Sequence, residues 1–270
     1  MIRPNCISIA GSDSGGEAGC QADLQAFADF DTHGSCAITA VTAQNPNSLF
    51  SVNPVHKQVL DEQISTLLKF FPDPYFKSGL MPRCEHIETA AALLGNTPLI
   101  ADPVMISTSG SQIMNTKTRL YYCKTLLPKA CVITPNYPEA EIISGLPINT
   151  PNNARAAIQK MADTYQSAIY LKGGHSSKPG IDLFYDGNEL YELSVNTLNI
   201  RSSHGTGCRL SAALCAALAC GYDMPKAAQL AKNYVFHSLQ SCRQISTEQW
   251  VMASPGTAKN LTMDVKIKKL

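Results

Sequence analysis

The chain has 270 residues, 44% of them hydrophobic, and its 22 lysines and arginines against 21 aspartates and glutamates leave a net charge of +1. This length and apolar content suit one large α/β domain or two small ones with a substantial core. The balanced charge provides no field of one sign to attract nucleic acid or an anionic membrane, so neither is expected as a partner. No apolar run is long enough to cross a bilayer, and no secretion signal pattern opens the chain, so we expect a cytoplasmic protein.

Short apolar segments alternate with longer amphipathic segments along most of the chain. Strands are predicted at Cys6–Ala10, Cys36–Val41, Tyr75–Gly79, Leu99–Ala101, Cys131–Thr134 and Ala168–Leu171. Helical periodicity predicts helices at Gln21–Phe30, Val55–Phe71, Glu85–Leu94, Lys117–Leu127 and Asn152–Tyr165. Such alternation is typical of right-handed crossovers, so we expect a mostly parallel sheet with helices on both faces, a three-layer α/β/α sandwich.

The C-terminal part of the chain departs from this alternation. The turn residues Asp186-Gly187-Asn188 predict an antiparallel hairpin within Asp182–Val195. Small residues dominate Leu210–Leu218, which favours a helix packed tightly inside the protein. From Gln244 onward the periodicity is lost. We therefore expect a single domain over residues 1–243 and a loosely held tail over residues 244–270.

The ten cysteines form no Cys-x-x-Cys pair, and no histidine pair lies near them at zinc spacing. Most of them sit in apolar runs, where a free thiol acts as a small hydrophobe. We expect neither a disulfide framework nor a metal cluster from them. Cys208 is the exception, because it stands at the predicted start of a helix.

The stretch His204-Gly205-Thr206-Gly207-Cys208 leads directly into the small-residue helix. The first turn of a helix has unpaired N–H groups and a positive dipole end, and glycines let an anion approach them closely. The stretch therefore predicts a phosphate cradle, with Gly205 and Gly207 as part of the catalytic apparatus. The same dipole predicts a lowered pKa for Cys208 and a role as base or nucleophile. A glycine-rich cap on a buried helix is the simpler alternative.

Polar residues gather directly after the predicted strands, and the carboxyl ends of parallel strands meet at one edge of a sheet, where such folds bind ligands. Each of these residues alone has an ordinary explanation as a cap, a turn residue or a solvated side chain. Together with the helix start they predict one site. They are Gly11, Ser12, Asp13, Gln44, Asn45, Asp102, Asn136, Glu139 and Lys172.

These residue types suit phosphoryl transfer, which needs a cation over the phosphates, ligands for Mg²⁺, an anion hole and a base. Lys172 supplies the cation, Glu139 and Asn136 can order magnesium and its waters, and Gly205–Cys208 supplies the anion hole. The glycine-rich segment Gly11–Gly19 lacks the closing Lys-Ser or Lys-Thr of a phosphate loop and the spacing of a dinucleotide fingerprint. We expect it to form a wall of the acceptor pocket.

The motifs over about residues 6 to 240 resemble the hydroxymethylpyrimidine/phosphomethylpyrimidine kinases, the thiamine-biosynthetic branch of the ribokinase-like fold. The resemblance rests on motifs that occur in order and at matching spacing. They are Ala10-Gly11-Ser12-Asp13 through Gln21-Ala22-Asp23, Ala43-Gln44-Asn45, Lys77-Ser78-Gly79-Leu80-Met81, Asp102-Pro103-Val104-Met105, Thr134-Pro135-Asn136, Pro138-Glu139-Ala140, Lys172-Gly173-Gly174-His175 and His204-Gly205-Thr206-Gly207-Cys208.

The resemblance implies a role for each matching residue, with ATP and Mg²⁺ as cofactors and a homodimer as the assembly. For the pyrimidine it implies contacts from Gly11, Asp23, Gln44, Met81 and Val104. For the nucleotide it implies Asn136, Lys172 and Thr206, and for the metal Asp102 and Glu139. It also implies that Cys208 is the catalytic base. Independently of the family, an amide such as Gln44 and a carboxylate such as Asp23 can complement the donors and acceptors of an aminopyrimidine.

Two positions depart from the family pattern: Glu17 stands where glycine is usual, and Arg209 where threonine is usual. A cation in the first turn of a helix opposes the dipole. We therefore expect an anion to answer Arg209, either a bound phosphate or Glu17 across the pocket, and we expect the two residues to be coupled. The usual closing segment of the family is also absent around Ser254–Thr262.

The function expected from these observations is ATP-dependent phosphorylation of 4-amino-5-hydroxymethyl-2-methylpyrimidine and then of its monophosphate. A pyridoxal or pyridoxine kinase of the same fold is the nearest alternative, although Gln44-Asn45 favours the aminopyrimidine. A non-catalytic pyrimidine-binding regulator is a third possibility, and the occupied catalytic positions argue against it.

Overall fold

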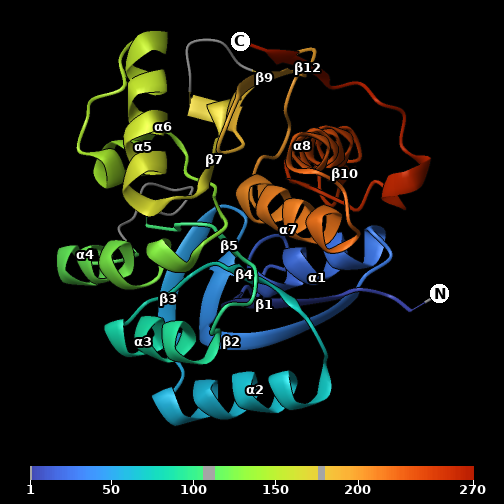
Figure 1. Ribbon diagram of the computed structural model, residues 1–270. Coiled ribbons are helices and arrows are strands. Elements are labelled where there is room, and N and C mark those ends of the chain that lie inside the picture. The colour runs from blue at the N-terminus through green and yellow to red at the C-terminus, as the bar shows by residue number, and fades with distance from the viewer. Residues whose placement is uncertain (1, 106–112, 176–179) are drawn as a thin grey trace.

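The computed structural model describes residues 2–105, 113–175 and 180–270, and it forms one ten-stranded sheet with helices on both faces (Figure 1). The strand order is β12-β9-β8-β7-β6-β5-β4-β1-β2-β3. The bounds are β1 (Asn5–Ser12), β2 (His33–Asn45), β3 (Ser48–Pro54), β4 (Tyr75–Ser78), β5 (Leu99–Ala101), β6 (Val132–Ile133), β7 (Ala168–Leu171), β8 (Ile181–Tyr185), β9 (Leu190–Ser194) and β12 (Lys266–Lys269). A small separate hairpin is formed by β10 (Arg243–Gln244) and β11 (Trp250–Val251).

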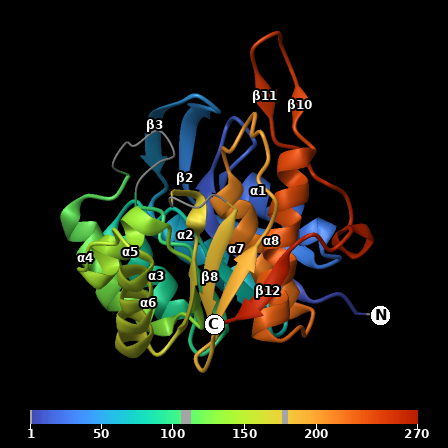
Figure 2. The same ribbon diagram turned by 90° about the horizontal axis from the view of Figure 1, so that it is seen from above.

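The helices divide between the two faces of the sheet, as Figure 2 shows. One face carries α2 (Lys57–Phe70), α3 (Cys84–Leu93), α4 (Thr116–Thr125), α5 (Tyr137–Ser144) and α6 (Pro151–Tyr165). The other face carries α1 (Gly19–Asp29), α7 (Thr206–Ala219) and α8 (Met224–Gln240). Two hydrophobic clusters follow this division: one includes Ile64, Tyr122 and Ile158, and the other includes Phe27 and Leu214. The predicted three-layer α/β/α sandwich is confirmed.

The predicted strands and helices are confirmed within a few residues, and β5 and β7 agree at both ends. The parallel part of the sheet joins β2, β1, β4, β5, β6 and β7. These strands are covered on both faces, and β7 is accordingly buried at every residue. The predicted hairpin is confirmed as β8 and β9, which add antiparallel strands at one side of the sheet.

The strand β3 was not predicted from the sequence. It pairs antiparallel with β2 at the edge of the sheet and is mostly exposed or partly exposed, so its residues show no buried apolar alternation. In the part of the chain that the structure describes, no helix is both long and apolar enough to cross a membrane.

The expectation of a loosely held C-terminal tail is wrong for the structure. β12 pairs with β9 along four residues and so becomes the outer strand of the sheet. Val265 is 2% exposed and Met252 is 4% exposed, so both side chains contribute to the interior. The segment lacks periodicity because it is anchored at separated points rather than along one face. The domain boundary at residue 243 stays a prediction.

Helix α7 explains how small residues place a functional helix start inside the protein. All its side chains from Arg209 to Leu218 are buried, and the helix packs against α1, α8 and the sheet. Alanine keeps the helix close to its neighbours at little cost in side-chain entropy. The N-terminal end of this buried helix lies at the edge of the sheet where the parallel strands end.

The anchored C-terminal segment generates a stability prediction. Val265→Ala should lower the free energy of unfolding by about 1–3 kcal/mol, because it removes buried methyl groups and leaves space behind. Met263→Ala is the matched control, since that side chain is 43% exposed. Chemical denaturation of both variants measures the difference. Equal stability of Val265→Ala and the wild type would show that the segment is loosely held in solution.

Candidate active site

A cavity of about 390 Å³ opens at the carboxyl edge of the parallel strands. Its walls come from the carboxyl ends of β1, β2 and β4, from the segments that follow β1, β4, β5, β6 and β7, and from the starts of β3, α1, α5 and α7. The residues that line it are Ala10, Gly11, Asp13, Ala18, Gly19, Thr42, Gln44, Leu49, Lys77, Gly79, Leu80, Asp102, Val104, Ile113, Asn136, Pro138, Glu139, Lys172, His204, Gly205, Thr206, Gly207 and Cys208. The structure therefore brings together twelve predicted site residues: Gly11, Asp13, Gln44, Val104, Asp102, Asn136, Glu139, Lys172, Gly205, Thr206, Gly207 and Cys208.

The start of α7 requires glycine at residue 205 and is tightly packed at a second glycine, Gly207. Gly205 precedes the helix with φ +82°, a left-handed conformation that L side chains rarely adopt. A Cβ atom there would lie 1.9 Å from the carbonyl oxygen of Glu17. At Gly207 a Cβ atom would lie 3.3 Å from Nζ of Lys172. The helix start therefore touches the glycine loop on one side and faces the site's lysine on the other.

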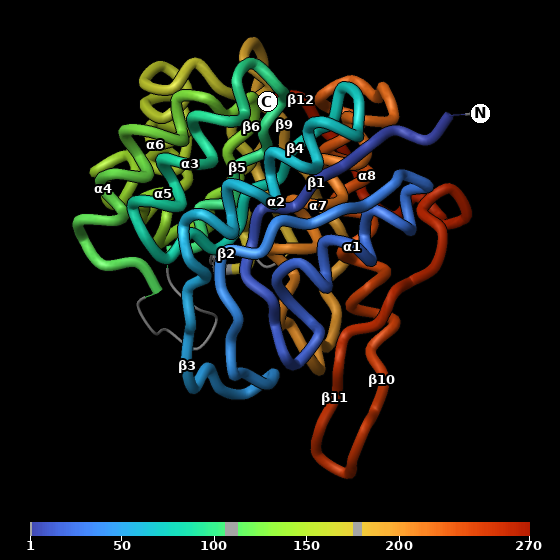
Figure 3. Tube along the Cα trace, turned by 90° about the horizontal axis from the view of Figure 1, so that it is seen from below, coloured from blue at the N-terminus to red at the C-terminus, as the bar shows by residue number. Residues whose placement is uncertain are grey.

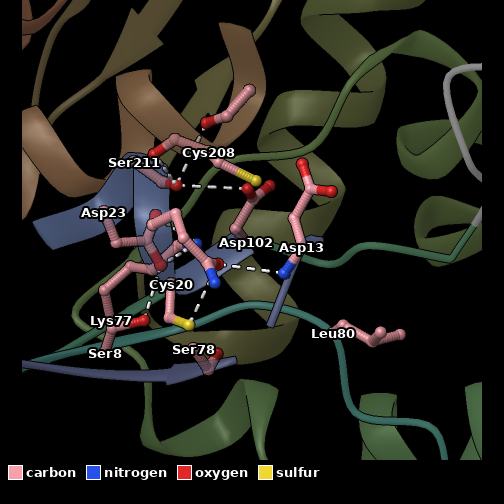
Figure 4. A network of polar contacts seen from close by, with 12 residues as sticks. Ser8, Asp13, Cys20, Asp23, Lys77, Ser78, Leu80, Asp102, Cys208 and Ser211 are labelled. Carbon is pink, nitrogen blue, oxygen red and sulfur yellow. Dashed lines mark hydrogen bonds and ion pairs between the residues drawn. The ribbon is translucent and has the colours of Figure 1, made fainter. Parts of the chain in front are cut away.

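Asp102 is buried and accepts three hydrogen bonds, of which Figure 4 shows the one from Ser211. Its Oδ1 accepts a hydrogen bond from Nζ of Lys172 at 2.8 Å and one from Oγ1 of Thr134 at 3.3 Å. Its Oδ2 accepts from Oγ of Ser211 at 3.1 Å. The carboxylate at the end of β5 thus joins the ends of β6 and β7 to helix α7.

Asn136 and Glu139 form a reciprocal cap at the start of α5. Oδ1 of Asn136 accepts from the Glu139 N–H at 2.9 Å, and Oε2 of Glu139 accepts from the Asn136 N–H at 2.8 Å. Burial raises the pKa of Glu139 to about 7, with Lys172 acting against the rise and Asp102 adding to it. The simple explanation of Asn136 as a helix cap is therefore correct, and the cap also fixes Glu139 in the cavity wall.

Lys172 carries the positive charge between these two carboxylates. Its Nζ lies 2.8 Å from Asp102 and 3.8 Å from Oε2 of Glu139, and its side chain is 16% exposed. Burial would lower its pKa, but Asp102 and Glu139 outweigh burial and the pKa is raised. The ammonium group stays charged and has an exposed side toward the cavity.

The residues at this edge fit a magnesium ion in company with a nucleotide. Mg²⁺ is usually held by one or two carboxylates, several waters and phosphate oxygens rather than by a full protein cage. Asp102 and Glu139 provide two carboxylates on the same cavity wall. No cluster of three or more such ligands occurs among the described residues, so protein ligands alone would not complete the coordination.

Asp23 and Met81 do not line the cavity in the described part of the chain, and their expected contact with the acceptor stays a prediction. Met81 is fully buried in the core cluster beside α2 and α3. Asp23 is also fully buried, and its charge is compensated there: both its oxygens lie 2.9 Å from Nζ of Lys77, and Oδ2 accepts from Oγ of Ser8. Lys77 is the member of this ion pair that reaches the cavity.

The expected lowering of the Cys208 pKa is wrong for the ligand-free protein. Burial raises the pKa of the Cys208 thiol to about 11, and the carboxylates of Asp23 and Asp102 add to the rise. Lys77 and the N–H of Gly19 act in the opposite direction. The loss of hydration in this cavity outweighs the helix dipole, because a thiolate depends on solvation for its stability.

Asp13 organises the glycine loop, a role that the sequence analysis did not assign. Its carboxylate accepts hydrogen bonds from the N–H groups of Gly15, Glu17 and Ala18 at 2.7–3.1 Å. Its Oδ2 also lies 3.5 Å from Nε2 of His204. Burial would raise the pKa of Asp13, but His204, followed by the Ala18 N–H, the Gln44 side chain and the Gly15 N–H, lowers it below its usual value. The loop after β1 is therefore held in one shape before any ligand binds.

Lys77 is the other functional residue that the sequence analysis missed. The sequence does contain an indication of its role, namely a lysine inside the short strand Tyr75–Ser78. A charged side chain in a buried strand needs a buried partner of opposite charge. The sequence could not reveal that the partner is Asp23 on α1. Ser211, one turn into α7, was hidden among the small residues of that helix.

Comparison with known proteins agrees with this geometry. The family described as phosphomethylpyrimidine kinase matches residues 13–253. A hydroxymethylpyrimidine/phosphomethylpyrimidine kinase of Synechococcus elongatus is 35% identical over 253 residues, covering 92% of this chain and 96% of that protein. A thiamine biosynthetic bifunctional enzyme of Arabidopsis thaliana is 35% identical over 248 residues, which are 90% of this chain and 48% of that protein.

Solved structures point to the same fold. The pyridoxal kinase of Staphylococcus aureus in complex with ADP superposes with a TM-score of 0.90 at 29% identity, and the match covers 100% of both chains. The same enzyme with AMP-PCP and pyridoxal gives a TM-score of 0.89. The match over residues 13–253 and the 35% identity to the Synechococcus enzyme place this chain in the phosphomethylpyrimidine kinase family.

Proposed function

We propose that this protein transfers the γ-phosphoryl group of ATP to the hydroxymethyl oxygen of 4-amino-5-hydroxymethyl-2-methylpyrimidine. A second transfer to the resulting monophosphate gives the diphosphate used in thiamine biosynthesis. Membership of the phosphomethylpyrimidine kinase family supports this substrate, and the name of the Arabidopsis relative supports the pathway. The observation that carries the proposal is the joint placement of Lys172, Asp102 and the start of α7 around one cavity.

The nucleotide side of the cavity follows from its charges. Lys172 and the N–H groups at the start of α7 face the transferring phosphoryl group, on which negative charge is spread in the transition state. Asp102 and Glu139 would hold Mg²⁺, which when bound neutralises charge on the phosphates. Thr206 and Asn136 complete the nucleotide wall. The ADP and AMP-PCP complexes of the Staphylococcus aureus relative support ATP as the donor.

We place the acceptor at Gly11, Gln44 and Val104, which line the cavity together with Cys208. The amide of Gln44 can donate to a ring nitrogen or accept from the exocyclic amine. We propose that Sγ of Cys208, as the thiolate, takes the proton of the hydroxymethyl group while its oxygen bonds to the γ-phosphorus and ADP leaves. The ammonium of Lys77 is the charge that favours this thiolate.

Pyridoxal is the second candidate acceptor, and the structural likeness to the Staphylococcus aureus pyridoxal kinase is the observation that favours it. ADP release with each acceptor, in the presence of ATP and Mg²⁺, tests the proposal. We expect turnover with the aminopyrimidine and its monophosphate, and weaker or no turnover with pyridoxal. Turnover with pyridoxal alone would replace the proposed substrate, and binding of the pyrimidine without turnover would favour a regulator.

We also propose a homodimer that forms through β3. The two edges of the sheet differ: β12 carries lysines at residues 266, 268 and 269, whereas β3 has no charged residue and exposes Phe50, which is 73% exposed. Lysine protects an edge strand from pairing, and its absence leaves the edge open to a second copy.

We also propose a cytoplasmic location, because ten free thiols suit a reducing compartment.

Lys172→Ala should raise the KM for ATP far more than the KM for the aminopyrimidine. The variant removes the point charge over the phosphates and leaves Asp102 and Glu139 without their counter-ion. Steady-state kinetics with each substrate varied in turn measures the split, and the exposed Lys160→Ala is the control. Unchanged ATP affinity with weakened pyrimidine affinity would contradict this placement of Lys172.

Gln44→Ala should leave a hydrogen-bonding group of the acceptor ring unpaired, which costs on the order of 1–3 kcal/mol in acceptor recognition. The expected increase in the KM for the aminopyrimidine is therefore about five- to 150-fold, with the KM for ATP nearly constant. The exposed Gln159→Ala serves as the control. A wild-type KM in Gln44→Ala would leave Gln44 with a purely structural role.

The raised pKa of Cys208 predicts a steep pH profile. Because the thiol pKa is about 11, alkylation of Cys208 in the ligand-free protein should accelerate roughly tenfold per pH unit above 7. Mass spectrometry of the Cys208 peptide measures this rate, and bound ATP with acceptor should protect the thiol.

Cys208→Ala should lose about a hundredfold to ten-thousandfold in kcat, whereas Cys208→Asp retains a base. Near-normal kcat in Cys208→Ala and Cys208→Ser would remove the base from the mechanism.

A further inference from the structure

Glu17 and Arg209 are buried charged residues that the proposed mechanism does not use. Glu17 is 4% exposed and Arg209 is 1% exposed, and within the described residues neither lines the cavity. No direct ion pair joins them in that part of the chain. A direct pairing of Glu17 with Arg209, one of the two partners expected from the sequence, is therefore wrong for the described residues, and a bound phosphate as the partner of Arg209 stays a prediction.

The two residues meet instead on the backbone of Met252. Oε2 of Glu17 accepts a hydrogen bond from the Met252 N–H at 2.8 Å. Nη2 of Arg209 donates to the Met252 carbonyl oxygen at 3.4 Å. The negative Glu17 carboxylate thus faces the N–H group of Met252, and the positive Arg209 guanidinium faces its carbonyl oxygen. Both hydrogen bonds are strengthened by the charge of the side chain. One residue of the C-terminal segment thus links two chain segments that form the site.

Residues 250–254, which we call the C-terminal strap, are anchored at further points. The ring of Trp250 lies 4.5 Å from the guanidinium carbon of Arg201. Oγ of Ser254 donates to Oδ2 of Asp29 at 2.7 Å, on the last turn of α1. Figure 3 shows the β10–β11 hairpin leading into this strap beside α1. The strap is therefore held by contacts to α1, to α7, to the segment before α1 and to Arg201.

The anchors of the strap lie next to the elements that would bind phosphate. The main chain of Glu17 is packed against Gly205, since a Cβ atom on Gly205 would lie 1.9 Å from the Glu17 carbonyl oxygen. The N–H of Arg209 donates to the Gly205 carbonyl at 3.0 Å, one of the first hydrogen bonds of α7. A shift of either side chain would therefore move the contact between the glycine loop and the helix start.

We propose that the C-terminal strap positions the active site, with Glu17 and Arg209 as positioning residues that act through Met252. The strap holds residues 13–19 against the start of α7, so that Gly205–Cys208 keep the spacing that phosphoryl transfer requires. This proposal rests on the proposed kinase function only for its catalytic consequence. The mechanical part of the proposal, that the strap holds residues 13–19 against the start of α7, concerns the protein without any ligand.

Hydrogen exchange tests the mechanical part without substrate. Glu17→Asp keeps the charge but shortens the side chain away from the Met252 N–H. Arg209→Lys keeps the charge but replaces the two donor nitrogens, Nη1 to Gln25 and Nη2 to Met252, by one ammonium nitrogen on a shorter side chain. We expect about tenfold faster exchange at residues 250–254 and also at residues 13–19 and 205–209 in either variant. The conservative controls Glu88→Asp and Arg155→Lys change exposed side chains and should leave these rates unchanged. Faster exchange confined to the strap would overturn the proposal.

Kinetics tests the catalytic part. We expect kcat to fall about tenfold in each variant, with the KM for the aminopyrimidine within about threefold of wild type. The double variant should lose less than the product of the two single losses, because both residues act through Met252. A loss of kcat in the double variant equal to the product of the two single losses would contradict the claim that both residues act through Met252. If the wild type turns over no acceptor, the proposed function fails, while the exchange experiment still decides whether the strap positions the helix start.

Discussion

The hydrogen bond between Lys172 and Asp102 is the contact on which the active site depends. The two residues follow β7 and β5, which are separated by β6 in the sheet, so their 2.8 Å contact requires the parallel order of all three strands. Asp102 also binds Ser211 on α7, and Lys172 lies between Asp102 and Glu139. Removal of either partner would leave an uncompensated charge in a largely buried place, which is costly. The ion pair therefore couples the fold to the charge pattern that suits a phosphoryl group.

The buried helix α7 imposes the second constraint. Its run of alanines lets it lie deep between α1, α8 and the sheet, and Gly205 and Gly207 let its first turn approach Glu17 and Lys172. Burial gives the helix start a dry environment in which N–H groups interact strongly with an anion. The same burial raises the pKa of Cys208. Burial therefore strengthens the anion hole but makes the Cys208 thiolate harder to form. The ammonium group of Lys77 partly offsets this rise in the pKa of Cys208.

The sequence predicted the layers of the fold and most of the site, because strand ends in a parallel sheet share one edge and their polar residues can be read in order. It failed for contacts that depend on packing between distant segments. The pairing of Asp23 with Lys77 and the anchoring of Met252 by Glu17 and Arg209 leave no periodic signal. The pKa of Cys208 was misjudged because the helix dipole is visible in the sequence, whereas the loss of solvent around the thiol is not.

The most direct test of the account is the Mg²⁺ dependence of ATP binding in Asp102→Asn, measured by titration calorimetry. The account predicts that Mg²⁺ strengthens ATP binding to the wild type and to the exposed control Asp163→Asn, and that this gain is lost in Asp102→Asn. A loss of about 1.4 kcal/mol or more, a tenfold change in affinity, is expected. A full Mg²⁺-dependent gain in Asp102→Asn would contradict the placement of the metal and the phosphates at this carboxylate.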